Sequence, residues 1–204
     1  MMKLSSLLEP ALDDLLARLK PLLAVVRVGR RGAGAGVLAG DGLVLTNHHV
    51  VGKGRGIEVE LADGQMFKAG LVADDPQVDL ALLQISGGNG HAAVFSTAEP
   101  RPGEMVYAFG HPWGQRYVLT AGVLSARTFG RTPSGEIPLL RADLQLAPGN
   151  SGGPLLNAAG EVIGLNAMIF GGDQSVAIPS TLIRSFLEQA RRSVPGLRHL
   201  EEVL

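Results

Sequence analysis

Short apolar runs separated by turn residues dominate the middle of the chain. Between residues 23 and 178, about ten runs rich in Val, Leu and Ile alternate with Gly, Pro, Asn and Asp. Asp41-Gly42 and Asp63-Gly64 are dipeptides typical of hairpin turns. Many short strands at this spacing favour an all-β barrel or sandwich. Residues 87–102 are poor in strand signals and are expected to connect two β units.

Both ends of the chain show a helical pattern instead. In residues 6–20 the leucines recur at helical spacing, with charged residues between them, and Pro10 falls in the first turn, where it is tolerated. A second apolar stripe follows Pro179 and predicts a helix over 181–193. We expect the first helix to pack on its own domain, with a subunit contact as the second interpretation.

Composition and charge exclude several classes of protein. The 18 basic and 19 acidic residues nearly cancel and form no long run of one sign, which disfavours a nucleic-acid or anionic-membrane surface. The absence of Cys excludes disulfides, thiolate nucleophiles and zinc–thiolate sites. Charged residues interrupt any signal-peptide core, and no apolar stretch could span a bilayer. We therefore expect a cytoplasmic protein, or a periplasmic or extracytoplasmic one if a leader was removed.

The segment Gly149–Pro154, with Ser151 inside it, carries the strongest chemical signal. A serine nucleophile needs open approach and backbone N–H donors for an oxyanion. The glycine before Ser151 can turn its N–H inward, and the glycine after it is expected to leave space for substrate. The same letters suit a tight turn or an α/β-hydrolase elbow. An elbow needs a helix directly after the serine, whereas residues 154–160 predict a short strand and turn.

A histidine and a carboxylate precede this serine at similar places in the pattern. The apolar strand 43–45 leads into residues 46–51, which contain His48 and His49. Asp79 directly precedes another apolar run. A lone His or Asp is usually structural. Three such residues in the order His, Asp, Ser, each beside a strand, are hard to assign to chance.

These motifs resemble those of the trypsin-fold serine proteases of the HtrA (Deg) type. The resemblance is carried by Thr-Asn-His-His-Val-Val, Asp-Leu-Ala-Leu-Leu and Gly-Asn-Ser-Gly-Gly-Pro-Leu, at residues 46–51, 79–83 and 149–155. Further matches lie at 108–114, 120–125, 160–166 and 177–180. The family commonly carries PDZ domains after the protease, and we expect a protease domain without one here.

The resemblance implies an all-β fold of two six-stranded antiparallel β-barrels of the trypsin-like type. The first barrel would span 22–90 and contain the histidine and aspartate, and the second would span 101–179 and contain the serine. Helices at 6–20 and 181–193 would flank them, within one protease domain covering 1–204.

The resemblance also implies a role for each site residue. His49 would be the general base, Asp79 would orient it, and Ser151 would be the nucleophile. The backbone N–H groups of Gly149 and Ser151, helped by Asn150, would form the oxyanion hole. His48 would be a surface or supporting residue, because neighbouring strand residues face opposite sides. The same alternation disfavours a metal site built from both histidines, and no cofactor is expected.

Residues downstream of the serine would bind substrate. By resemblance, Asn166, Ala167 and Met168 would pair with the substrate backbone and line the pocket for the residue before the scissile bond. We expect a preference for small or medium aliphatic residues there, since no charge lies nearby to bind Lys or Arg.

The expected activity is a serine endopeptidase that cleaves unfolded or misfolded polypeptides through an acyl-enzyme. The alternative is a weakly active or inactive protease-fold module with a binding or chaperone-like role. Proteases of this family are often trimers with N-terminal segments at the contact, so the helix at 6–20 could form a homotrimer. A monomer is the alternative, because only 4% of residues are aromatic and could anchor a contact.

Overall fold

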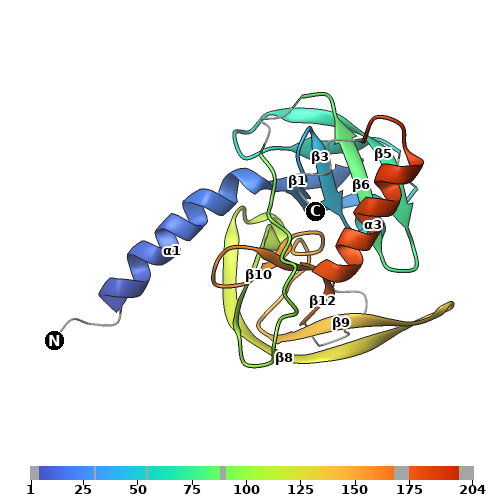
Figure 1. Ribbon diagram of the computed structural model, residues 1–204. Helices are drawn as coiled ribbons and strands as arrows, with labels where there is room; N and C mark the ends of the chain where they lie inside the picture. Colours follow the sequence, from blue (N-terminus) through green and yellow to red (C-terminus); the bar gives the residue numbers. More distant parts are fainter. Residues whose placement is uncertain (1–4, 30, 54, 88–90, 168–174, 198–204) are drawn as a thin grey trace.

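Two closed six-stranded antiparallel barrels form the body of the protein (Figure 1). The structure, a computed structural model, describes residues 5–29, 31–53, 55–87, 91–167 and 175–197. The first barrel consists of β1 (Leu23–Val28), β2 (Arg31–Leu38), β3 (Leu43–Thr46), β4 (Ile57–Glu60), β5 (Met66–Asp75) and β6 (Leu80–Ile85). The second consists of β7 (Met105–Gly110), β8 (Val118–Thr132), β9 (Gly135–Asp143), β10 (Pro154–Leu156), β11 (Val162–Asn166) and β12 (Ser175–Pro179). The predicted all-β, two-barrel fold is confirmed.

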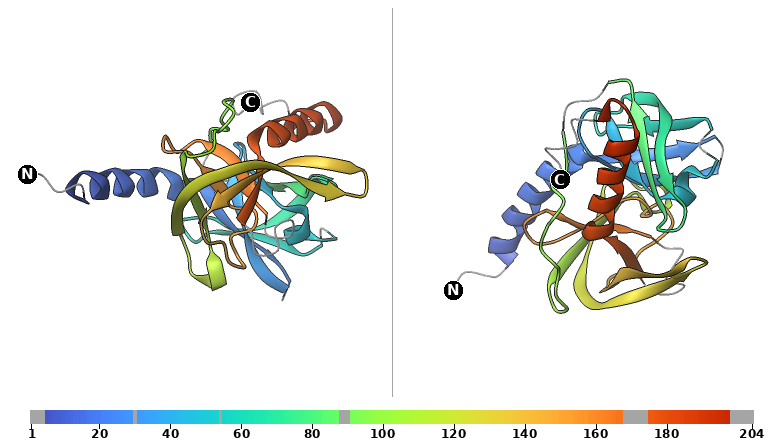
Figure 2. Two further views of the ribbon diagram at one scale, coloured as in Figure 1. Left: turned by 90° about the horizontal axis from the view of Figure 1, so that it is seen from below. Right: turned by 45° about the vertical axis from the view of Figure 1, so that its right-hand side comes forward.

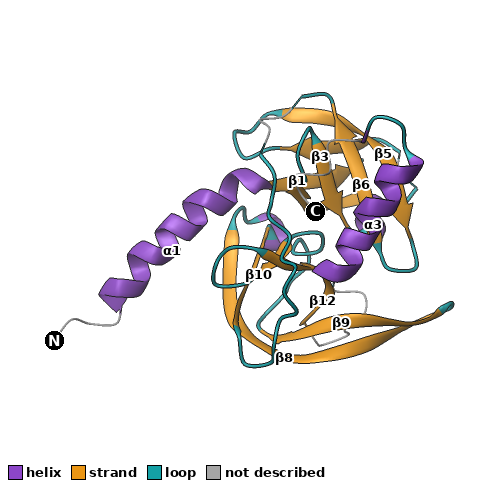
Figure 3. Cartoon of the chain, viewed as in Figure 1, coloured by secondary structure: helices purple, strands orange, loops and turns teal. Residues whose placement is uncertain are grey.

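The two barrels repeat one topology. Around the first, the strands follow the order β1-β2-β3-β6-β5-β4, and β4 closes the ring on β1. Around the second the order is β7-β8-β9-β12-β11-β10, with β10 closing on β7. Each ring of strands is closed, and the hairpin of β8 and β9 extends past its ring (Figure 3). The molecule therefore consists of two similarly built barrels that meet at a junction.

Strands that lie at this junction bury both of their faces. In β3, Val44 points into the first barrel, whereas Leu43 and Leu45 belong to the core between the barrels. Side chains alternate along a strand, so one run of apolar residues supplies two cores. This explains why β3 and β6 appear in the sequence as continuous apolar runs rather than as alternating ones.

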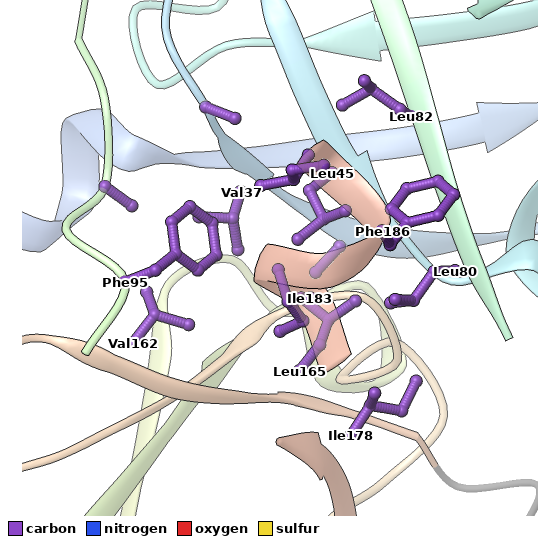
Figure 4. Packing of buried hydrophobic residues seen from close by; sticks show 14 of the residues in the cluster. Val37, Leu45, Leu80, Leu82, Phe95, Val162, Leu165, Ile178, Ile183 and Phe186 are labelled. Carbon is purple, nitrogen blue, oxygen red and sulfur yellow. The ribbon is translucent and has the colours of Figure 1, made fainter. Parts of the chain in front are cut away.

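Helix α3 (Ser180–Ser193) packs over the junction. Its Ile183 and Phe186 join Leu80 and Leu82 of the first barrel and Leu165 of the second in one cluster (Figure 4). Full burial of such side chains is worth about 1.5–3 kcal/mol each. The helix therefore fixes the barrels relative to each other.

Helix α1 (Ser5–Leu19) leads through a short 3₁₀ turn, η1 (Lys20–Leu22), into β1. Leu15 and Leu19 near its end are buried, and Leu15 packs beside Gly160. The rest of the helix extends away from the barrels (Figure 2). Among the described residues, no helix is long and apolar enough to cross a membrane.

The β8–β9 hairpin is long, and it projects beyond its barrel (Figure 1). Near its tip the Ser134 hydroxyl donates a hydrogen bond to Gln77 Oε1 at 2.6 Å. Gln77 lies in the turn that ends at Asp79. The second barrel thus contacts the loop that carries the predicted catalytic aspartate.

Candidate active site

Asp79 and His49 form a closely bonded pair at the rim of the first barrel. Asp79 Oδ2 lies 2.7 Å from His49 Nδ1, and Asp79 Oδ1 accepts the His49 backbone N–H at 2.8 Å. The Asp79 carboxylate is 2% exposed and the His49 side chain 28%. A buried carboxylate on Nδ1 selects the tautomer with a proton there, which leaves Nε2 free to accept one.

The backbone of Asp79 is held in the left-handed region, with φ of +58°. Its carbonyl accepts the Asn47 side-chain N–H at 3.0 Å and the His48 backbone N–H at 3.1 Å. Asp and Asn adopt this region more readily than other residues with a side chain, and surrounding bonds hold Asp79 in it. Three consecutive residues, Asn47 to His49, therefore fix Asp79.

The histidines lie in a helical turn, α2 (His48–Val51), and not in the strand that the sequence predicted. Strand alternation therefore does not apply to His48 and His49, and the prediction based on it is wrong. The two rings still diverge, because successive helical residues are about 100° apart. His48 Nδ1 lies 3.0 Å from Asp74 Oδ2, at ion-pair distance but without hydrogen-bond geometry. His48 thus points to a different acid from His49.

Ser151 lies in the loop before β10 and is tied to the first barrel. Its carbonyl accepts the Ala35 N–H at 2.8 Å, and the Ala35 carbonyl accepts the Thr46 hydroxyl at 2.7 Å. Thr46 ends the strand that leads to His49, so the serine loop and the histidine turn share one support. Ser151 is 7% exposed. Within the described part of the chain, no hydrogen bond joins the Ser151 hydroxyl to the His49 ring.

The two glycines that flank this serine are required by the fold. Gly149 has φ of +109°, and a Cβ there would lie 2.2 Å from the His111 carbonyl oxygen. Gly152 has φ of +83°, and its Cβ would lie 2.1 Å from the Ala35 carbonyl oxygen. The space beside Gly152 is thus filled by the first barrel. The expectation that this glycine makes room for substrate is wrong.

Two backbone donors of this loop have no acceptor among the described residues: the N–H groups of Gly149 and Ser151. By contrast, the Asn150 N–H donates to the Ala147 carbonyl at 2.9 Å. The Asn150 side chain is buried, with its Oδ1 beside Gly110. The geometry therefore leaves Gly149 and Ser151 as candidate oxyanion donors, with Asn150 committed to shaping the loop.

Asn166 and Ala167 are buried beside the serine loop, whereas Met168 lies outside the described residues. The Asn166 N–H donates to Gly153 O and its carbonyl accepts from Gly152 N–H, at 2.8 and 3.0 Å. Its side-chain amide bonds to the Pro154 carbonyl. These hydrogen bonds hold the serine loop against β11. A direct role of Asn166, Ala167 or Met168 in binding substrate stays a prediction.

His111 is a buried residue of this region that had no predicted role. It follows β7, and its Nδ1 accepts the Tyr117 backbone N–H at 3.3 Å. Burial lowers the pKa of His111 to about 4, and the charges of Arg116 and Arg27 act in the same direction, against the Ala24 carbonyl and Glu60. Its place in the family match at 108–114 and a His-Pro pair after a strand are the signals that the sequence offers for it.

The His111 shift predicts a loss of stability in acid. In the unfolded chain the imidazole titrates near 6.5, so below that pH the unfolded state binds the proton that the native state excludes. The free energy of unfolding should fall by about 3 kcal/mol as the pH drops from 6.5 to 4, and this part should then level off. Urea titrations at several pH values measure it, and His111→Gln should flatten this part of the profile. If the free energy of unfolding of His111→Gln fell with pH as steeply as that of the wild type, His111 would not be the cause of the loss.

The described residues of this site form no metal centre. Within the described ranges, no group of three His, Asp or Glu side chains is placed to hold an ion. The chemistry available is that of an imidazole, a buried carboxylate, a hydroxyl and backbone N–H groups.

Comparison with known proteins places the chain among proteases. The trypsin-like peptidase domain family matches residues 34–165. A probable periplasmic serine endoprotease, DegP-like, from Marinomonas sp. (strain MWYL1) is 38% identical over 169 residues, 79% of this chain and 36% of that protein. One of the same name from Pseudomonas putida is 42% identical over 137 residues, 66% of this chain and 28% of that protein. The chain thus spans about a third of the length of these curated relatives.

A solved structure of a serine endoprotease is also similar to this chain. The crystal structure of a serine endoprotease from Yersinia pestis superposes with a TM-score of 0.78 at 30% identity, covering 89% of this chain and 66% of that one. The expected cytoplasmic location finds no support among relatives that are named periplasmic. The protein belongs to the trypsin-like peptidases and is similar to the DegP-like serine endoproteases among them.

Proposed function

We propose that the chain is a serine endopeptidase that acts through His49, Asp79 and Ser151. The observation that carries this proposal is the bonded pair of Asp79 and His49, in which one buried carboxylate binds both the ring and the backbone of the histidine. Such a partner orients the ring and stabilises the imidazolium that forms during catalysis. The unpaired N–H groups beside Ser151 add a binding place for an oxyanion.

The reaction would run in two halves. His49 Nε2 takes the proton of the Ser151 hydroxyl as Oγ bonds to the carbonyl carbon, and the carbonyl oxygen becomes an oxyanion between the Gly149 and Ser151 N–H groups. The C–N bond then breaks as His49 returns the proton to the leaving amine. Water attacks the acyl-enzyme by the same route, and the acid and Ser151 are released.

We further propose that the substrates are unfolded or misfolded polypeptides and that the chain works in the periplasm, as the names of its relatives indicate for them. An extended backbone can enter a site at the junction of two barrels, whereas a folded surface presents few such segments. The preference for small aliphatic residues before the cut, and the oligomeric state, stay predictions.

Digestion of casein, which is unfolded, tests this function against a stably folded protein of similar size. We expect casein to be cut and the folded protein to stay intact, with mass spectrometry locating cuts after small or medium aliphatic residues. Cuts mainly after Lys or Arg would contradict the expected specificity. Binding of casein without cleavage would instead support the protease-fold binding module.

A further inference from the structure

The segment 111–117, between β7 and β8, contacts the serine loop through two backbone hydrogen bonds. The His111 N–H donates to the Gly149 carbonyl at 3.2 Å, and the Trp113 N–H donates to the Pro148 carbonyl at 2.8 Å. These carbonyls belong to the two peptide planes that flank the Gly149 Cα. The segment therefore fixes both peptide planes at Gly149, including the one that contains the Gly149 N–H.

The second of these bonds sets the direction of a candidate oxyanion donor. In a trans peptide the C=O and N–H point in opposite directions, and the structure contains no cis peptide among its described residues. With the Pro148 carbonyl turned toward Trp113, the Gly149 N–H must point away from segment 111–117. Loss of that bond would allow the plane to rotate, since Gly149 tolerates more backbone conformations than other residues.

The same segment is attached to the first barrel by an ion bridge. Arg116 Nη1 lies 2.5 Å from Glu60 Oε1, and Glu60 Oε2 lies 3.1 Å from Arg27 Nη2. Glu60, on β4, is 6% exposed, so each of its oxygens is desolvated and each faces an arginine. Exposed ion pairs contribute little to stability, but a buried carboxylate that loses its partner is strongly disfavoured.

The backbone of the segment needs such external support. Trp113 has φ of +53° and Tyr117 has φ of +60°, both in the left-handed region that favours glycine. Each such residue costs about 1–3 kcal/mol and persists only where its surroundings enforce it. Arg116 lies directly before one of them. Its bond to Glu60 is therefore placed to hold the segment in a conformation that it would otherwise leave.

We propose that Glu60 and Arg116 form a cross-barrel clamp, which holds segment 111–117 and through it orients the Gly149 N–H toward the oxyanion. The inference rests on the proposed peptidase function. Both are positioning residues: neither forms a hydrogen bond or ion pair with His49, Asp79 or Ser151 among the described residues. The clamp makes the activity of the second barrel depend on a side chain of the first.

Steady-state kinetics of Arg116→Gln and Glu60→Gln on a fluorogenic peptide test the clamp. We expect kcat to fall about tenfold to a hundredfold with KM within about twofold, because a misdirected donor weakens binding of the transition state and not of the substrate. The double variant should lose no more than the worse single one, and Arg116→Lys should recover part of the activity. Arg127→Gln, which breaks the exposed Arg127–Glu99 pair elsewhere, should match the wild type.

A second readout does not depend on activity. Trp113 is the only tryptophan of the chain, so its fluorescence anisotropy reports the motion of segment 111–117 directly. Anisotropy should fall in both clamp variants and stay unchanged in Arg127→Gln. Wild-type kcat and wild-type anisotropy in Arg116→Gln would overturn the clamp. A wild-type protein that neither hydrolyses peptides nor reacts with a fluorophosphonate would refute the peptidase function instead, and the anisotropy would still decide the clamp.

Discussion

Ser151→Ala should abolish peptide hydrolysis, lowering kcat by about 10⁶-fold, the loss seen when the nucleophile of such a site is removed. Without Oγ no acyl-enzyme can form, and only binding and the oxyanion donors remain. Folding should be unaffected, since the Ser151 hydroxyl forms no hydrogen bond within the described structure and only its backbone supports the fold.

Initial rates on a fluorogenic peptide, with thermal unfolding of the same samples, measure this prediction. Ser185→Ala is the matched control, because it removes an exposed hydroxyl of α3 that bonds only to the carbonyl one turn earlier. It should leave both kcat and the unfolding temperature at wild-type values. Substantial hydrolysis by the Ser151 variant would show that another residue is the nucleophile.

Asp79→Asn should lower kcat by about 10⁴-fold while leaving the protein folded. Asp79 uses both carboxylate oxygens as acceptors, for the ring Nδ1 and for the backbone N–H of His49. An amide offers one acceptor and one donor, so the ring would lose its partner or adopt the wrong tautomer. Asn accepts the left-handed backbone that Asp79 adopts, which preserves the turn.

Asp75→Asn provides the comparison. It makes the same change in the same turn, where Asp75 Oδ1 accepts the Gln77 backbone N–H and an amide oxygen can replace it. Its kcat should stay within about twofold of wild type, as expected for a substitution away from the machinery. Equal losses in both variants would mean that the turn matters and the carboxylate on His49 does not.

Apolar spacing predicted many short strands in a barrel or a sandwich, and the two-barrel arrangement came from the resemblance to the HtrA-type proteases. The apolar strand at 43–45 and the apolar run after Asp79 coincide with β3 and β6, because strands that are buried on both faces need apolar side chains throughout. The length of β8 and β9 could not be found this way. Both strands extend past their barrel, where exposed polar positions carry no burial signal.

The local structure at the site was harder to predict. Asn is common at the position before a helix. Asn47, directly before the two histidines, could therefore have predicted the start of α2. Gly152 was misinterpreted because the space around a glycine depends on segments remote in sequence, here Ala35. The bridge from Glu60 to Arg116 likewise joins residues on different barrels, and no spacing rule connects them.

Reaction with a fluorophosphonate probe tests the central claim most directly, since only a serine with a working base and oxyanion donors is acylated quickly. Intact-mass and peptide mass spectrometry should show one probe per chain, on Ser151. Asp79→Asn should react far more slowly, and Ser151→Ala not at all. An unlabelled wild-type protein, or a label on any other residue, would contradict the account.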